Sequence, residues 1–350
     1  MAPSIPIWRQ IQRKNITQPE KLADYLCLDA QNRVKLLYNP RFPLNLPLRL
    51  AEKIAKNTLD DPILRQFVPL KEETQSQPGF TLEPVQDQLF LRSKKILHKY
   101  KGRALVLATS ACAMHCRYCF RQNFPYETRA AGFNEELAYI QSHKDISEII
   151  LSGGDPLSLS NEALQSLFHS LDAISHVKRI RFHTRFPIGI PERIDDAFLH
   201  LLASSSKQIF FIIHCNHARE LDGDIKKALK KIQRLGIPIL NQSVLLKGVN
   251  DTEEAMLALS ETLIDTGIVP YYLHQLDPVE GAGHFAVTDA KGLELIEYLR
   301  KNTSGFGVPK LVREEVGASG KTTLTHPSDI FQDEERARIY KTRLLKALIF

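Results

Sequence analysis

Three of the five cysteines in the chain lie within eight residues, at Cys112, Cys116 and Cys119. Thiolates at such spacing are ligands of zinc or of iron–sulfur clusters. A closed zinc site takes four ligands, usually in two pairs, and the chain has no second cysteine pair, although His115 or Cys215 could complete one. A [4Fe–4S] cluster on three cysteines leaves one iron open to a small molecule with an amine and a carboxylate. The spacing therefore predicts a metal centre rather than three buried core cysteines.

From residue 103 onward, the elements that must position this centre alternate between β-rich runs and amphipathic helices. The strand-like runs are residues 104–109, 148–152, 180–184, 209–214, 237–243, 271–275 and 309–312. Helical spacing of apolar residues covers 161–174, 220–236, 252–267 and 289–302. This alternation predicts parallel βα units with right-handed crossovers. About six units and a closing edge strand are too few for a complete barrel, so we expect an α/β fold, an incomplete (βα)6 TIM-like barrel.

The remainder of the chain predicts two flanking parts. Residues 1–97 form a helical extension, with helical spacing at 18–28 and 46–57 and an exposed connection at 71–88. Residues 98–325 form the core, and residues 326–350 form a short tail. In parallel folds the chemistry lies at the carboxyl ends of the strands. Polar segments follow the predicted strands there: the cysteines, then 152–156, 183–185, 214–217, 241–243 and 274–277.

The composition limits the compartment and the partners. With 43% hydrophobic and 25% charged residues the chain is typical of globular proteins, and it has neither a membrane-spanning apolar run nor a signal peptide at its start. Five cysteines, an odd number, indicate a reducing compartment, so we expect a cytoplasmic protein. The net charge of +6 is modest and scattered, which predicts neither a nucleic-acid nor a membrane partner.

The cysteine motif, with Tyr118 before its last cysteine, resembles the signature of radical S-adenosylmethionine (SAM) enzymes. The resemblance implies that the three cysteines hold a [4Fe–4S] cluster and that its free iron binds SAM, the source of a 5′-deoxyadenosyl radical. The segment Ser152, Gly153, Gly154 and Asp155 is similar to the glycine motif that meets the amino group of SAM in this superfamily, and glycines allow the backbone to approach a ligand closely.

Residues 85–325 also resemble the lysine 2,3-aminomutase family, through segments such as SGGDPL, NQSVLLKGVND and HQLDPVEGAGHF. This resemblance implies an isomerase that converts (S)-α-lysine to (R)-β-lysine with a second cofactor, pyridoxal 5′-phosphate (PLP). The family holds PLP on a lysine in a glycine-rich segment, which matches Lys321 in EEVGASGKTTL.

The same resemblance implies the remaining site residues. Arg121 matches the arginine that pairs with the substrate carboxylate, and its planar fork suits a carboxylate. Asp277 and Glu314 match the two acids for the ε-ammonium, although the family has aspartate at the second position. The implied cofactor ligands are Lys99 and Arg103 for the PLP phosphate, and Arg185, His214 and Gln242 near SAM.

The resemblance further implies a subfamily and its partners. The chain ends 29 residues after Lys321 without another cysteine beyond Cys215, and is similar to enzymes that supply β-lysine for modification of elongation factor P. The implied partners are free L-lysine, an electron donor such as flavodoxin or ferredoxin, and a ligase resembling lysyl-tRNA synthetase. Two alternatives stay open: an aminomutase for another amino acid such as glutamate, and a non-catalytic metal-binding module.

Overall fold

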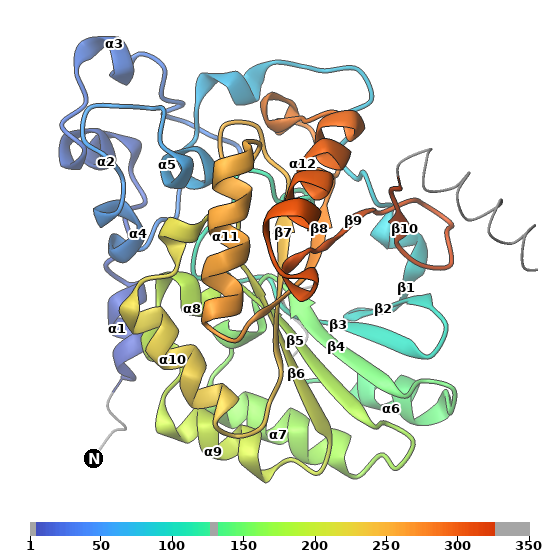
Figure 1. Cartoon of the computed structure of the whole chain (residues 1–350). Coiled ribbons are helices and arrows are strands. Elements are labelled where there is room, and N and C mark those ends of the chain that lie inside the picture. Colours follow the sequence, from blue (N-terminus) through green and yellow to red (C-terminus); the bar gives the residue numbers. More distant parts are fainter. Residues whose placement is uncertain (1–4, 127–131, 326–350) are drawn as a thin grey trace, which may run out of the picture.

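The structure is a computed structural model that describes residues 5–126 and 132–325. In this part of the chain ten strands form one sheet, in the order of the sequence from β1 to β10 (Figure 1). The strands are β1 (Leu91–Ser93), β2 (Ile96–Tyr100), β3 (Arg103–Thr109), β4 (Glu148–Gly153), β5 (Arg179–Thr184), β6 (Gln208–His214), β7 (Ile239–Val244), β8 (Val269–His274), β9 (Lys310–Arg313) and β10 (Thr322–Thr323).

The strands from β3 to β9 pair in parallel, each with the next one along the chain. This confirms the expected partial barrel built from βα units, because consecutive parallel neighbours require a crossover between each pair. The run at 309–312 was expected at the sheet edge, and this detail is wrong. It forms β9, and β10 pairs with its free side in the antiparallel direction.

The other edge of the sheet also differs from the expectation. β1 and β2 pair antiparallel with each other, and β2 pairs antiparallel with β3. These two strands therefore extend the sheet into residues 91–97, which were assigned to a helical extension. Their short length and irregular register leave a weak periodic signal in the sequence, which explains why a hairpin of this kind escapes pattern analysis. The predicted tail, 326–350, lies outside the described residues.

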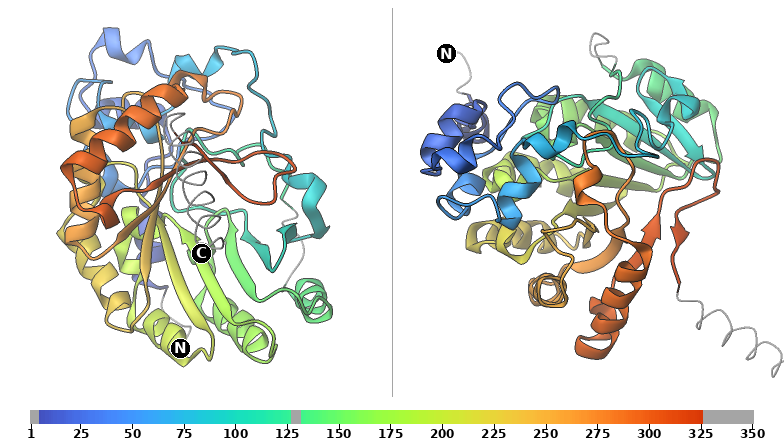
Figure 2. Two further views of the ribbon diagram at one scale, coloured as in Figure 1. Left: turned by 45° about the vertical axis from the view of Figure 1, so that its right-hand side comes forward. Right: turned by 90° about the horizontal axis from the view of Figure 1, so that it is seen from above.

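Helices cover the outer face of the parallel strands, as Figure 2 shows. They are α6 (Asn134–Ser142), α7 (Asn161–Asp172), α9 (Asp196–Ser204), α10 (Gly223–Gln233), α11 (Glu253–Asp265) and α12 (Asp289–Asn302). Side chains of Ser160, Asp195, Asp222, Thr252 and Thr288 accept backbone N–H bonds at their starts, which satisfies donors that a helix leaves unpaired. α7, α10, α11 and α12 match the predicted helices; α6 and α9 were not among them.

Strand β5 shows how the sheet separates an apolar outer face from a polar interior. Successive side chains of a strand point to opposite faces. Phe182 is fully buried and stacks on Phe168 of α7, with 5.8 Å between the ring centroids. Arg181 and His183, one residue to either side, therefore face away from this helical layer. The interior of the barrel consequently carries polar groups, as a ligand site requires.

The N-terminal helices lie on one side of the sheet in Figure 1, and two residues of the segments between them bond the loop that carries the three cysteines. The helices are α1 (Ile7–Gln12), α2 (Pro19–Tyr25), α3 (Ala30–Arg33), α4 (Leu48–Glu52) and α5 (Pro62–Phe67). Asn45 Nδ2 donates to the Cys112 carbonyl at 3.2 Å, and Asn15 Nδ2 donates to the Ala113 carbonyl at 2.7 Å. The extension thus holds the backbone of the cysteine loop in place.

Candidate active site

The loop after β3 brings Cys112, Cys116 and Cys119 together at the carboxyl end of the barrel. Burial, followed by the charge of Asp155, raises the pKa of the Cys112 thiol well above its usual value, and the other two cysteines contribute in the same direction. That mutual influence means the three sulfurs share one small space. The remaining cysteines are elsewhere: Cys27 is exposed, and the buried Cys215 donates its thiol to a backbone carbonyl.

Three cysteine thiols in one loop are a donor set that an iron–sulfur cluster takes. In the described residues no group of three His, Cys, Asp or Glu side chains is placed to hold one metal ion. The Nδ1 of His115 lies 2.8 Å from the Pro43 carbonyl, and its ring stacks on Phe42. A [4Fe–4S] cluster does not need three sulfurs around one ion, because each thiolate binds a different iron. The residues therefore fit a cluster, and the described contacts give no support to His115 or Cys215 as a fourth zinc ligand.

The glycine turn after β4 packs on the backbone of the cysteine loop. A Cβ added to Gly153, whose φ is +113°, would lie 2.7 Å from the Thr109 carbonyl oxygen, and one on Gly154 would collide with the Ala111 carbonyl. The Gly154 N–H donates to the Thr109 carbonyl at 2.6 Å. Both positions therefore require glycine for contacts within the protein, in addition to any contact with a ligand.

Asp155 ties the ends of β4 and β5 together. Its buried carboxylate accepts hydrogen bonds from the Thr184 hydroxyl at 2.7 Å and from the backbone N–H groups of Leu157, Arg185 and Phe186. Burial raises its pKa to about 6, although these bonds oppose the shift. Both carboxylate oxygens of Asp155 therefore accept hydrogen bonds from within the protein.

Arg121 is buried next to the cysteine loop and is held by residues from two other elements. Its Nε donates to Asp87 Oδ2 at 2.8 Å, and its Nη1 lies 3.4 Å from the Ser152 hydroxyl. Asp277 follows β8 and is partly buried. Burial raises its pKa to about 7, while the charges of Lys321 and Arg121 oppose this shift. Arg121 and Lys321 thus both lie within electrostatic reach of Asp277.

Glu314 joins the two edges of the partial barrel. Its carboxylate accepts hydrogen bonds from Lys99 Nζ at 2.5 Å and from the Tyr100 hydroxyl, both in β2, and from Lys321 Nζ at 3.0 Å. Arg103 lies beside them, with its guanidinium carbon 4.5 Å from the Tyr100 ring centroid. Lys99 and Glu314, which were predicted for different ligands, are therefore in direct contact.

Three histidines whose Nε2 atoms are buried line the interior near Lys321. His183, His214 and His274 come from β5, β6 and β8, and the Nε2 atom of each has no hydrogen-bond partner in the described part of the chain. Burial lowers the pKa of each imidazole, that of His214 to about 3, and the Lys321 charge acts in the same direction. Buried polar atoms without partners are rare, so these neutral rings fit a polar ligand inside the barrel.

Gln242, also predicted near SAM, is the register partner of His214 on β7. Four residues near the site were not predicted as site residues from the sequence: His183, His274, Asp87 and Tyr100. The polar HTR and HQLD segments after the strands were a signal for the two histidines. Asp87 and Tyr100 carry no such signal, because their partners lie far away in the sequence.

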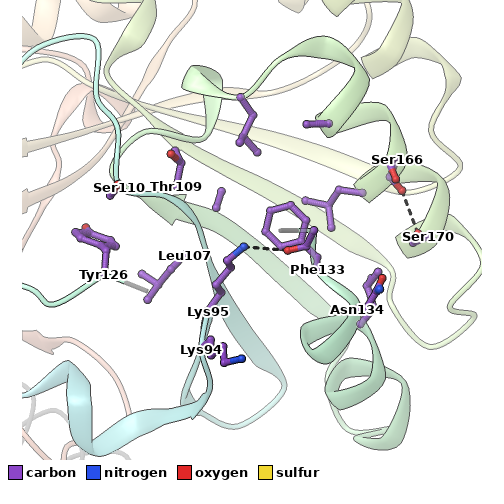
Figure 3. Close-up of a pocket in the computed structure, with 16 residues that line it drawn as sticks. Lys94, Lys95, Leu107, Thr109, Ser110, Tyr126, Phe133, Asn134, Ser166 and Ser170 are labelled. Carbon is purple, nitrogen blue, oxygen red and sulfur yellow. Dashed lines mark hydrogen bonds between the residues drawn. The ribbon is translucent and has the colours of Figure 1, made fainter. Parts of the chain in front are cut away.

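A separate cavity of about 360 Å³ lies between β3, α6 and α7, outside the barrel interior (Figure 3). Its lining includes Lys94, Thr109, Phe133 and Ser166. None of the predicted site residues lines it, so it is not the site described above.

The comparisons with known proteins agree with this geometry. The Radical SAM superfamily profile matches residues 106–259, which span β4 to β7 and the cysteine loop. The L-lysine 2,3-aminomutase of Escherichia coli (strain K12) is 39% identical over 327 residues, covering 92% of this chain and 95% of the relative. Those of Haemophilus influenzae and Clostridium subterminale are 39% and 31% identical, covering 90% and 94% of this chain and 94% and 80% of the relatives.

The partial barrel and the three-cysteine loop, together with the superfamily match, define a radical SAM enzyme. Such enzymes use a [4Fe–4S] cluster and SAM. The chain belongs to the L-lysine 2,3-aminomutase family, a family of isomerases. The resemblance found in the sequence is thereby confirmed.

Proposed function

We propose that the protein converts L-lysine to (R)-β-lysine. The observation that carries the proposal is the placement of Lys321 next to Glu314, within electrostatic reach of Asp277 and of the three interior histidines. An amine, two acids and neutral polar groups inside one barrel match the needs of an amino acid with a cationic tail. Relatives named for lysine 2,3-aminomutation cover most of the chain, which supports the same substrate.

The proposed cofactors are the cluster, SAM and PLP. When bound, they supply a carbon-centred radical and a carbonyl group for the migrating nitrogen. Cys112, Cys116 and Cys119 would hold the cluster. Lys321 would bind PLP covalently through its amine, and Lys99 and Arg103 would neutralise the phosphate.

SAM is proposed to lie between the cysteine loop and the strand ends that carry Ser152, Gly153 and Gly154. Arg185, His214 and Gln242 border the same region. The unpartnered Nε2 of His214 supports a ligand at this place. Asp155 is proposed to act there through the turn that it holds, since its own oxygens are occupied.

The substrate is proposed to lie between Arg121 and the two acids. The Arg121 guanidinium binds the carboxylate, and Asp87 holds one edge of the guanidinium so that it stays oriented. Asp277 and Glu314 bind the ε-ammonium. Glu314 already pairs with two lysines. Asp277 is therefore the main residue that recognises the ε-ammonium of the substrate. A glutamate side chain would bring a like charge toward both acids, which disfavours that alternative substrate.

The wider setting is inferred from chemistry and from the family. A radical SAM cluster needs an external one-electron donor, and a flavodoxin or ferredoxin has the required chemistry. We infer that the product passes to a lysyl-tRNA-synthetase-like ligase that modifies elongation factor P. We also infer a cytoplasmic location, because free cysteines and a reducible cluster require a reducing compartment. Within the described residues no helix is long and apolar enough to cross a bilayer.

The direct test is an anaerobic assay of the reconstituted protein with SAM, PLP, a reductant and L-lysine. We expect (R)-β-lysine by chiral chromatography and no comparable turnover of L-glutamate. If the protein converts glutamate as fast as lysine or faster, lysine is not its preferred substrate and the proposal is wrong. A protein that binds zinc but neither iron nor PLP would instead identify a non-catalytic metal module.

A further inference from the structure

A buried arginine contacts one of the three cysteines that the proposed function assigns to the cluster. The Nη1 of Arg185 donates to Cys116 Sγ, with 3.0 Å between the two atoms. Arg185 directly follows β5, and its side chain is only 5% exposed. Because a guanidinium keeps its charge at any ordinary pH, this contact is a cationic hydrogen bond to sulfur in a region from which water is excluded.

The guanidinium is fixed by partners from two other parts of the chain. Its Nη2 donates to Glu220 Oε2 at 2.7 Å and to Gln66 Oε1 at 2.5 Å. Gln66 belongs to α5, and its own Nε2 donates to Glu220 Oε1 at 3.1 Å. The Phe67 ring lies against the guanidinium, 4.5 Å from its central carbon. Arg185 therefore cannot turn away from Cys116 without breaking a buried ion pair.

One donor of Arg185 remains unused. Its Nε is buried and has no hydrogen-bond partner in residues 5–126 and 132–325. Glu220, in contrast, is fully buried and accepts bonds from Arg185, Gln66 and the Asn216 backbone. An unsatisfied cationic donor next to Cys116 fits an acceptor that the polypeptide does not supply, such as a cluster sulfide.

The charges of Arg185 and Glu220 would affect how readily a cluster bound at Cys116 accepts an electron. Reduction adds one negative charge, so a positive charge and a hydrogen bond at a ligand sulfur stabilise the reduced form and raise the reduction potential. We propose that Arg185 and Glu220 are positioning residues that set the reduction potential of the cluster through Cys116. Arg185 raises the potential, and the Glu220 carboxylate lowers it by compensating part of the charge. This inference rests on the proposed cluster, but not on the identity of the substrate.

The test is a redox titration of the reconstituted protein without SAM, following the electron paramagnetic resonance signal of the reduced cluster. At the wild-type midpoint, Arg185→Gln should reduce the ratio of reduced to oxidised cluster about tenfold, which is about 59 mV for a one-electron couple. Glu220→Gln should shift the ratio in the opposite direction. Opposite shifts are a result that a purely structural role of the pair would not produce.

Two further variants keep the test decisive. Arg185→Gln leaves Glu220 as an unpaired buried charge, which can prevent folding. The double variant Arg185→Gln/Glu220→Gln removes both charges, and its potential should lie below that of Glu220→Gln. Arg219→Gln is the matched control: this arginine is 43% exposed and pairs with Asp61 at 2.9 Å, so its loss should leave the potential unchanged.

The outcomes separate the inference from the proposed function. If wild-type protein binds no iron, the proposed cluster fails. If iron binds normally and the potentials of the single and double variants equal that of the wild type, the inference is overturned and the cluster stands. If Arg185→Gln weakens SAM binding and leaves the SAM-free potential unchanged, Arg185 acts on SAM alone, which also overturns the inference.

Discussion

The Oε2 atom of Glu314 accepts a hydrogen bond from Nζ of Lys321, with 3.0 Å between the two atoms. Its other oxygen accepts bonds from Lys99 and Tyr100. Although burial opposes the shift, the Lys321 charge and these hydrogen bonds lower the pKa of Glu314 to about 2. In the substrate-free protein Glu314 is therefore the counter-ion of Lys321. Attachment of PLP to Lys321, as proposed, would take up this amine, and Glu314 would then have an oxygen available for the substrate ammonium.

Changes at Glu314 should separate the charge of this residue from its length. Glu314→Asp retains the carboxylate, so we expect lysine turnover with an altered KM. Glu314→Gln removes the charge that faces the ammonium, and kcat/KM for lysine should fall about tenfold or more, or about 1.4 kcal/mol. Glu315→Gln is the matched control, since the Glu315 side chain is exposed and bonds Thr322. Steady-state assays measure both KM and kcat/KM. Unchanged kinetics in Glu314→Gln would show that Glu314 does not bind the substrate.

Lys321 should carry PLP. Borohydride reduction followed by peptide mapping should place the phosphopyridoxyl group on the peptide that contains Lys321. Lys321→Ala should lose the label, and Lys310→Ala should retain it, because Lys310 is exposed at the start of β9. A label on any other lysine would contradict the assignment.

The three loop cysteines should each be required for iron. Cys112→Ala, Cys116→Ala and Cys119→Ala should lose the cluster, measured as iron and sulfide per chain after anaerobic reconstitution. Cys27→Ala and Cys215→Ala should retain it, because one side chain is exposed and the other bonds a backbone carbonyl. Full iron content in Cys116→Ala would disprove the ligand set.

Asp277→Asn should impair lysine turnover more than any change at Glu314. Removal of one partner from a partly buried ion pair leaves the other charge without water or a counter-ion. We expect kcat/KM for lysine to fall about 100-fold or more, or about 2.7 kcal/mol. Cluster and PLP contents should stay normal, which the absorbance spectrum checks. Turnover at the wild-type rate would show that the tail is recognised elsewhere.

The pH dependence of stability should also report on Asp277. Burial raises its folded-state pKa to about 7 from the ordinary value of 3.8. Between these values the folded protein binds a proton that the unfolded chain releases, so this contribution to stability falls as the pH rises from about 4 to about 7 and is constant above. Thermal unfolding of substrate-free protein should show a shallower decline in Asp277→Asn across this window. Burial raises the pKa of Asp155 to about 6, so Asp155 titrates in the same pH range. The contribution of Asp277 is therefore given by the difference in stability between wild type and variant.

Lysine binding should follow the same titration. Only the ionised Asp277 attracts the ε-ammonium, so KM for lysine should decrease as the pH rises toward about 7. The decrease should be absent in Asp277→Asn. An equal pH dependence in both proteins would assign it to another group.

The features that depend on neighbours along the chain could be predicted from the amino-acid sequence. Strands such as β5 and helices such as α12 follow from local periodicity, and their succession predicts parallel units. The spacing of Cys112, Cys116 and Cys119 within one loop likewise predicts a metal centre. These properties are local. The alternation of side chains along a strand, and the short spacing of cysteines in one loop, do not depend on the rest of the fold.

The pairing of the charged side chains, in contrast, depends on the three-dimensional fold. Lys99 and Glu314 are 215 positions apart, and Gln66 and Arg185 are 119 apart, yet each pair is in direct contact. The strands β1 and β10 are also decided by the fold, since short strands form only where a partner edge is present. Charged side chains carry no signal of their distant partners, because pairing depends on how the sheet curves and which edges approach. The barrel therefore sets the partners of Glu314 and Arg185, whereas the chain order alone sets the cysteine loop.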